Sequence, residues 1–129
     1  MSSQTRLTRA YKEAKRIQFT NQDKFILFSD CHRGDGSFAD DFANNRNIYV
    51  HALNQYYKNG FQYVELGDGD ELWENLFFKD VLEANKNVFL LMKKFYLQKK
   101  LHMIYGNHDM VYRNQSIVKR NFSDYFDTT

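Results

Sequence analysis

The sequence predicts an α/β fold in which three parallel strands alternate with helices. The first observation is a set of three short apolar runs, at residues 24–29, 61–66 and 101–105, each followed directly by a polar cluster. The second is that helix-compatible stretches separate these runs. Alternation of strands and helices favours a parallel sheet with right-handed crossovers. We therefore expect a parallel βαβαβ unit.

The first apolar run is continuous rather than alternating. It runs from Lys24 to Ser29 and ends at Asp30. Continuous runs of this kind are typical of strands that are buried on both faces. The second run, Phe61 to Leu66, leads into Gly67-Asp68, and the third, Leu101 to Tyr105, leads into Gly106.

Two helices are expected between the strands. Asp40 or Asp41 is suited to cap the first, which ends at Asn59-Gly60. The second spans about Asp80 to Lys99. The side chains expected to face the core are Phe42, Ile48, Leu53 and Tyr56 on the first helix and Val81, Val88, Leu91, Met92 and Phe95 on the second. Residues 1–23 are expected to form an N-terminal helix or arm, and residues 24–129 the domain.

Composition sets bounds on the class of protein. The chain has 129 residues, of which 43% are hydrophobic, and carries a formal net charge of +2. These values argue against disorder and give no nucleic-acid or membrane-surface signature. No apolar run approaches the roughly 20 residues of a membrane span, and the N-terminus lacks a signal-peptide pattern. The single cysteine excludes an internal disulfide, so we expect a cytoplasmic protein.

Polar clusters follow all three predicted strands. They are Asp30-Cys31-His32, Gly67-Asp68 and Gly106-Asn107-His108-Asp109. Because the carboxyl ends of parallel strands lie side by side and bind ligands there, we expect these clusters to converge on one rim.

The residue types in these clusters suit divalent metal ions. Asp30 and His32 are separated by one residue, so in an extended segment both side chains would point the same way. Asp68 has two carboxylate oxygens and is suited to bridge two cations, while Asn107 offers a neutral amide oxygen. Two cations about 3.5–4 Å apart can clamp a phosphate ester and activate a hydroxide for in-line attack.

The remaining polar residues have predicted roles around that chemistry. His108 is expected to face the substrate as the catalytic histidine, and Asp109 to hold its imidazole in one tautomer. Arg33 is interpreted equally as a phosphate ligand or as a surface arginine. Cys31 is expected to be a small buried residue, and His51 and His102 to be structural.

The three motifs in this order resemble the calcineurin-like metallophosphoesterase superfamily. Ser29-Asp30-Cys31-His32, Asp40-Asp41-Phe42 and Leu72-Trp73 most resemble its UDP-2,3-diacylglucosamine hydrolase-like branch. The resemblance implies the N-terminal half of an αββα sandwich and a phosphate-ester small-molecule substrate. It implies that Asp30 and His32 bind a first metal, that Asn107 binds a second metal and that Asp68 bridges the two. It also implies that His108 is the catalytic histidine. Manganese is favoured over iron or zinc.

The chain also departs from the family pattern. Cys31 stands where an aliphatic residue is common, Gly69 replaces an apolar residue, and either Asp70 or Glu71 fits the expected acid. The family has a downstream Gly-His-x-His segment, whereas no histidine follows His108 here. We therefore expect a truncated domain with an exposed apolar sheet face suited to self-association.

Three hypotheses follow. The first is a metal-dependent phosphoesterase that hydrolyses a phosphomonoester, phosphodiester or pyrophosphate bond. The second is a catalytically incompetent fragment with weak metal binding that acts as an interaction module. The third is a different α/β domain whose Asp and His clusters coincide by chance.

Overall fold

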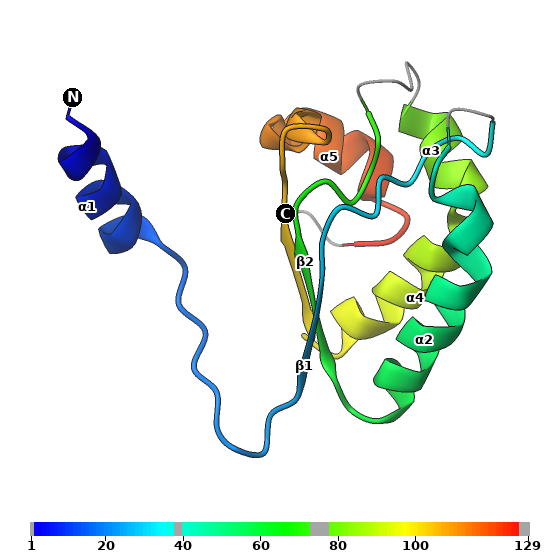
Figure 1. Cartoon of the computed structure of the whole chain (residues 1–129), viewed down its shortest axis with the longest axis horizontal. Coiled ribbons are helices and arrows are strands. Elements are labelled where there is room, and N and C mark those ends of the chain that lie inside the picture. Colours follow the sequence, from blue (N-terminus) through cyan, green and yellow to red (C-terminus); the bar gives the residue numbers. More distant parts are fainter. Residues whose placement is uncertain (1, 38–39, 73–77, 127–129) are drawn as a thin grey trace.

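The computed structural model of this chain has the predicted order of strands and helices (Figure 1). It describes residues 2–37, 40–72 and 78–126, so Trp73 of the Leu72-Trp73 motif lies outside the described residues. The strands are β1 (Phe25–Phe28), β2 (Gln62–Leu66) and β3 (Leu101–Ile104). The helices are α1 (Ser3–Glu13), α2 (Arg46–Lys58), α3 (Phe78–Ala84), α4 (Lys86–Leu97) and α5 (Gln115–Phe122), with 3-10 turns η1 (Ala43–Asn45) and η2 (Met110–Arg113).

The three strands form one parallel sheet in the order β1-β2-β3. Phe25 pairs with Gln62, and Tyr63 pairs with Leu101. This confirms the predicted α/β class and its three-stranded parallel sheet. As Figure 1 shows, the carboxyl ends of all three strands point toward the same end of the molecule.

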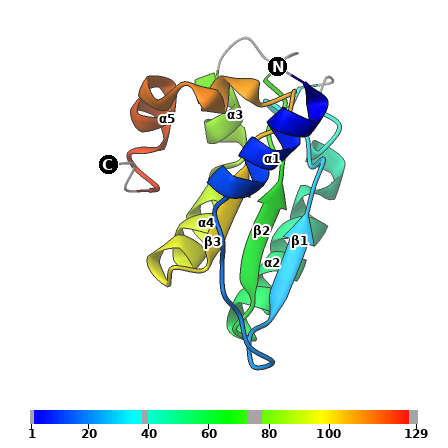
Figure 2. The same cartoon turned by 90° about the vertical axis from the view of Figure 1, so that its left-hand side faces the viewer.

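The hydrophobic core lies on one face of the sheet. Figure 1 shows α2 and α4 on the same side of the strands, and Figure 2 shows the opposite face of the sheet. The fully buried apolar side chains of the core are Leu53, Tyr63, Val88, Phe89, Met92 and Phe95. The predicted core positions of the second helical stretch, Val81, Val88, Leu91, Met92 and Phe95, are all buried, as expected.

The other face of the sheet is exposed over the described residues. Leu27 is 54% exposed, Leu66 45% and Ile104 57%. The prediction that the first strand is buried on both faces is therefore wrong, because α2 and α4 cover the same face and leave Leu27 of β1 exposed. The predicted exposure of an apolar sheet face is confirmed for these three residues.

The first predicted helix differs from the expectation both in where it begins and in which side chains it buries. The prediction that Asp40 or Asp41 caps this helix is wrong, because α2 begins after Asn45 and has no side-chain cap. The Asp40 carboxylate instead accepts hydrogen bonds from the backbone N–H of Phe42 and Ala43, each at 3.0 Å, in the turn before η1. The turn η1 then precedes α2, whose buried face carries Tyr49 and Leu53. These two residues are four apart and so share a face, which leaves Ile48 71% exposed instead of in the predicted core.

The second predicted helix is two helices rather than one. The break falls at Asn85, which is fully buried between α3 and α4. Its amide donates to the carbonyl oxygens of Gly34 and Val81, each at 2.8 Å, and its oxygen accepts from Arg46 at 3.0 Å. Asn85 thus ties the helix junction to the loop that follows β1.

The N-terminal segment forms the predicted helix or arm. The Ser2 hydroxyl caps α1 by accepting from the Thr5 N–H, and no residue of α1 is buried. Within residues 2–37, 40–72 and 78–126, none of the helices is both long enough and apolar enough to cross a membrane.

Candidate metal centre

The loops that follow the three strands are joined by backbone and side-chain hydrogen bonds. The N–H of Asp30 donates to the Gly67 carbonyl at 3.2 Å, and that of His32 donates to the Asp68 carbonyl at 3.0 Å. The Asp68 carboxylate accepts from the backbone N–H of His108 at 2.8 Å. The three polar clusters of the sequence therefore meet at one edge of the sheet, as predicted.

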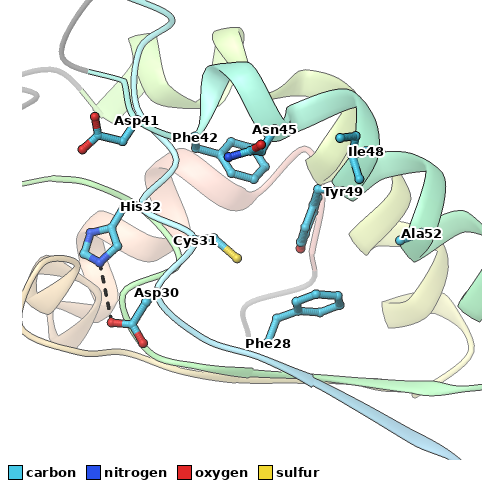
Figure 3. A pocket seen from close by; sticks show the side chains of 10 residues that line it. All are labelled: Phe28, Asp30, Cys31, His32, Asp41, Phe42, Asn45, Ile48, Tyr49 and Ala52. Carbon is cyan, nitrogen blue, oxygen red and sulfur yellow. Dashed lines mark ion pairs between the residues drawn. The ribbon is translucent and has the colours of Figure 1, made fainter.

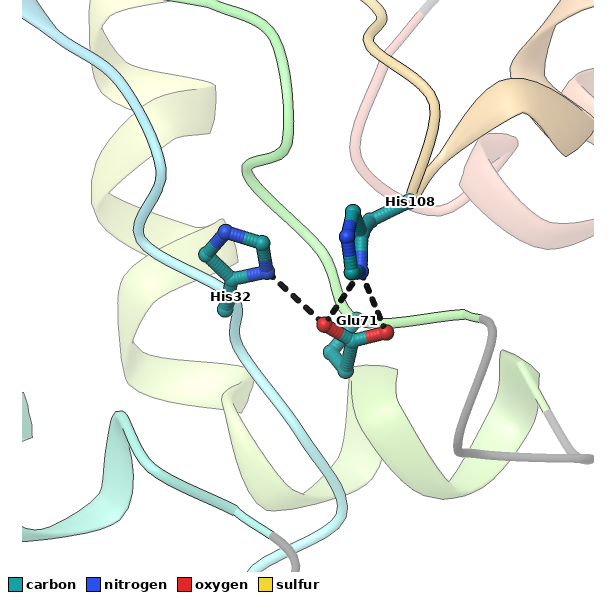
Figure 4. A group of neighbouring side chains, drawn as sticks. All are labelled: His32, Glu71 and His108. Atoms are coloured by element: carbon teal, nitrogen blue, oxygen red, sulfur yellow. Dashed lines mark hydrogen bonds and ion pairs between the residues drawn. The ribbon is translucent and has the colours of Figure 1, made fainter.

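One group of potential metal ligands consists of His32, Glu71 and His108 (Figure 4). Their ligand atoms lie within 4.8 Å of one another. Nδ1 of His32 lies 2.7 Å from Glu71 Oε2, and Nδ1 of His108 lies 2.7 Å from the same oxygen. Burial opposes the ionisation of Glu71, but its hydrogen bonds with the two imidazoles hold its pKa below the usual range. Glu71 is thus an ionised carboxylate between two histidines.

A second group consists of Asp30, His32 and Asp68, whose ligand atoms also lie within 4.8 Å of one another. The His32 Nε2 atom lies 3.6 Å from Asp30 Oδ1, on the other side of the ring from Glu71. His32 therefore belongs to both groups and offers one ring nitrogen to each.

Three of these residues have an unusual backbone conformation. Asp30, His32 and Asp68 have φ values of 54°, 50° and 51°, in the left-handed region that non-glycine residues rarely adopt. The expectation that Asp30 and His32 lie in an extended segment is therefore wrong. Such strain persists only where the surrounding structure holds it, and it concentrates at functional sites.

Asn107 lies at the same edge but is exposed. The next residue in the chain, His108, donates its backbone N–H to Asp68. The role of Asn107 as a ligand of a second metal stays a prediction.

Asp109 has a different role from the predicted one. Its buried carboxylate accepts hydrogen bonds from the backbone N–H groups of Gly106 at 2.5 Å, Gly69 at 3.0 Å and Asp68 at 3.3 Å. The imidazole of His108 is bonded by Glu71 instead. The prediction that Asp109 orients His108 is corrected: Asp109 holds together the loops that follow β2 and β3.

Beneath the two ligand groups lies a buried ion-pair network centred on Arg33. Its guanidinium, with no exposed surface, donates to Glu65 at 2.7 and 2.8 Å and to Asp70 at 2.8 and 3.1 Å. Tyr63 and Tyr112 donate their hydroxyls to these two carboxylates. Both interpretations of Arg33, as a phosphate ligand and as a surface arginine, are corrected, because the residue is wholly enclosed.

This network also explains why glycine stands at position 69. A Cβ at position 69 would lie 1.9 Å from Glu65 Oε1 and 2.7 Å from an Arg33 nitrogen. Only glycine leaves room for the bidentate Arg33–Glu65 pair. The adjacent acids Asp70 and Glu71 therefore have different partners: Asp70 bonds Arg33, and Glu71 bonds the histidines.

The remaining candidate residues are peripheral to the two groups. Cys31 is half-buried, and burial raises the pKa of its thiol to about 11, which keeps it protonated at neutral pH. His51 is exposed, and His102 hydrogen-bonds Gln62 at 3.0 Å. The expectation that His51 and His102 are structural stays a prediction.

Sequence reasoning left the role of Glu71 open and missed the buried network. One signal for the network was present: Glu65 is a charged residue in the middle of an apolar strand. A carboxylate at such a position requires a buried partner.

Comparisons of this chain with protein-family models, with curated proteins and with solved structures found no match. The functional assignment therefore rests on the geometry of the two ligand groups.

Proposed function

We propose that this chain is a metal-dependent phosphoesterase of the calcineurin-like type. The observation that carries the proposal is the meeting of two His and carboxylate groups, joined through His32, at the carboxyl edge of a parallel sheet. The substrate would be a small molecule with a phosphomonoester, phosphodiester or pyrophosphate bond.

The donor set fits divalent transition metals. His32, Glu71 and His108 offer imidazole nitrogen and carboxylate oxygen, and Asp30 and Asp68 add further carboxylates. Mixed nitrogen and oxygen ligation suits manganese, iron or zinc. A metal ion would take the place of the hydrogen bonds that now join Glu71 to the two imidazoles.

Each residue would have a defined part in the reaction. Bound cations would supply Lewis-acid stabilisation of the phosphoryl oxygens and would lower the pKa of water. Asp30, Asp68 and Glu71 would balance the cation charge, and Asn107 would add a neutral oxygen ligand. The nitrogen of His108 that does not bind a cation would carry the ring proton and would donate a hydrogen bond to the leaving oxygen.

The test is hydrolysis of 4-nitrophenyl phosphate and bis(4-nitrophenyl) phosphate by the purified chain with added Mn²⁺. We expect metal-dependent turnover that falls by roughly 100-fold or more in Asp68→Asn and in His108→Gln. Glu83→Gln, which alters an exposed acid on α3 away from the site, is the control. Hydrolysis that survives both site variants would contradict the proposal.

A metal-binding module without turnover is the second candidate. The exposed apolar face at Leu27, Leu66 and Ile104 favours it, because such a face is suited to association with another protein surface. Metal binding that requires Glu71, with no hydrolysis of either ester, would select this candidate over the enzyme.

A further inference from the structure

A cavity of about 480 Å³ opens beside the candidate metal centre (Figure 3). Asp30 and His32 lie at one end of it, and Ile48 and Ala52 of α2 lie at the other. Its volume falls in the range of small-molecule sites. A group bound here would therefore be close to a phosphate that cations on Asp30 and His32 would hold.

The walls of this cavity are mostly apolar and include three aromatic rings. The apolar, aromatic and sulfur-bearing side chains that form these walls are Phe28, Cys31, Phe42, Ile48, Tyr49 and Ala52, and the polar side chain of Asn45 also lines the cavity. Phe28 and Phe42 both meet the Tyr49 ring edge to face, with centroids 5.3 and 5.2 Å away. Each ring is thus held in place by its neighbour.

The polar atom of one wall residue is already paired in the core: the Tyr49 hydroxyl hydrogen-bonds the Tyr63 hydroxyl at 2.5 Å. Apart from the Asn45 amide, these walls offer few partners to the polar groups of a sugar or a second phosphate, and burying such groups unpaired is costly. Asp41, an exposed carboxylate on the rim, would also repel a further anionic group.

We propose that this cavity binds an aryl substituent of the phosphate ester, so that the substrate class of the site is an aryl phosphoester. The inference rests on the proposed function for the position of the phosphate, but the binding of an aryl group does not require metal or turnover. Aromatic rings favour edge-to-face contacts with other rings, which is the arrangement already present in the wall.

The test is a titration of the metal-free chain with 2-naphthol, in which the fluorescence of the naphthol measures binding. We expect saturable binding that weakens at least 10-fold in Ala52→Phe, which fills the end of the cavity away from Asp30 and His32. Gln55→Phe adds the same ring to an exposed position of α2 outside the cavity and should bind as the wild type does. Equal binding by the wild type and Ala52→Phe would overturn the proposal.

A second variant and a second ligand keep the test decisive. Ile48→Glu places a charge at a wall position that is 71% exposed, so the fold should tolerate it, and it should weaken 2-naphthol binding in the same way. Binding of n-hexanol as tight as that of 2-naphthol would overturn the aryl class. Naphthol binding without hydrolysis of any ester would support the aryl site and refute the proposed phosphoesterase activity. Hydrolysis without naphthol binding would support the activity and refute the aryl site.

Discussion

Glu71 and Asp70 are adjacent in sequence, yet their carboxylates serve different parts of the molecule. Glu71 bonds His32 and His108 at the edge of the sheet, whereas Asp70 is fully buried against Arg33. The parallel bridge between Arg33 and Asp70 extends the β1–β2 pairing and fixes which carboxylate turns inward. Sequence spacing alone contains no signal for this choice, because either acid follows the Gly67-Asp68 motif closely enough.

Substitution of these two acids should separate function from stability. We expect Glu71→Gln to lower Mn²⁺ affinity by roughly 100-fold while changing the free energy of unfolding by about 1 kcal/mol or less. Asp70→Asn should lower the free energy of unfolding by about 3 kcal/mol, because it breaks one arm of a buried ion pair. Calorimetric titration and urea unfolding measure the two quantities. Equal stability losses in both variants would contradict the division of roles.

The thiol of Cys31 should be unreactive in the folded chain. Burial raises its pKa to about 11 from an ordinary value of 9.0, so at pH 8 the thiolate fraction falls roughly 100-fold. We expect alkylation by iodoacetamide at pH 8 to be slower by about that factor in the native chain than in urea, and to rise with pH. Native and unfolded rates that agree within a few-fold would show that Cys31 is accessible and normally acidic.

At the scale of elements, the order of strands and helices could be read from the sequence, but some of their ends could not. The apolar runs that lead to Asp30, Gly67 and Gly106 identify the strands because each run is short, continuous and followed by a polar motif. The break between α3 and α4 has no such local signal. It depends on Asn85, whose partners Gly34 and Arg46 lie far away in the sequence.

Asn85 should therefore matter more for stability than its neighbours. We expect Asn85→Ala to lower the free energy of unfolding by about 2–3 kcal/mol, since it leaves the buried Gly34 carbonyl and the Arg46 guanidinium without this partner. Asn87→Ala, at an exposed position of α4, should change it by about 0.5 kcal/mol or less. Thermal unfolding followed by circular dichroism compares the two. If Asn87→Ala lowered the free energy of unfolding as much as Asn85→Ala, the role of Asn85 at the helix junction would be contradicted.

At the scale of the whole molecule, one face of the sheet holds the core and its carboxyl edge holds the candidate site. Convergence of the three motifs could be predicted, because parallel topology brings strand ends together whatever their separation in sequence. The left-handed conformations of Asp30, His32 and Asp68 could not, because none of these residues is glycine. They result from backbone hydrogen bonds between loops that only the assembled sheet brings into contact.

The central claim is that the edge of the sheet binds divalent metal ions through these residues. The most direct measurement is the anomalous scattering of crystals of the full chain soaked in Mn²⁺. We predict manganese peaks within coordination distance of Glu71 and both its histidine partners, and of Asp30 and Asp68. A map without peaks there, or with manganese only at exposed acids such as Asp80 and Glu83, would contradict the account.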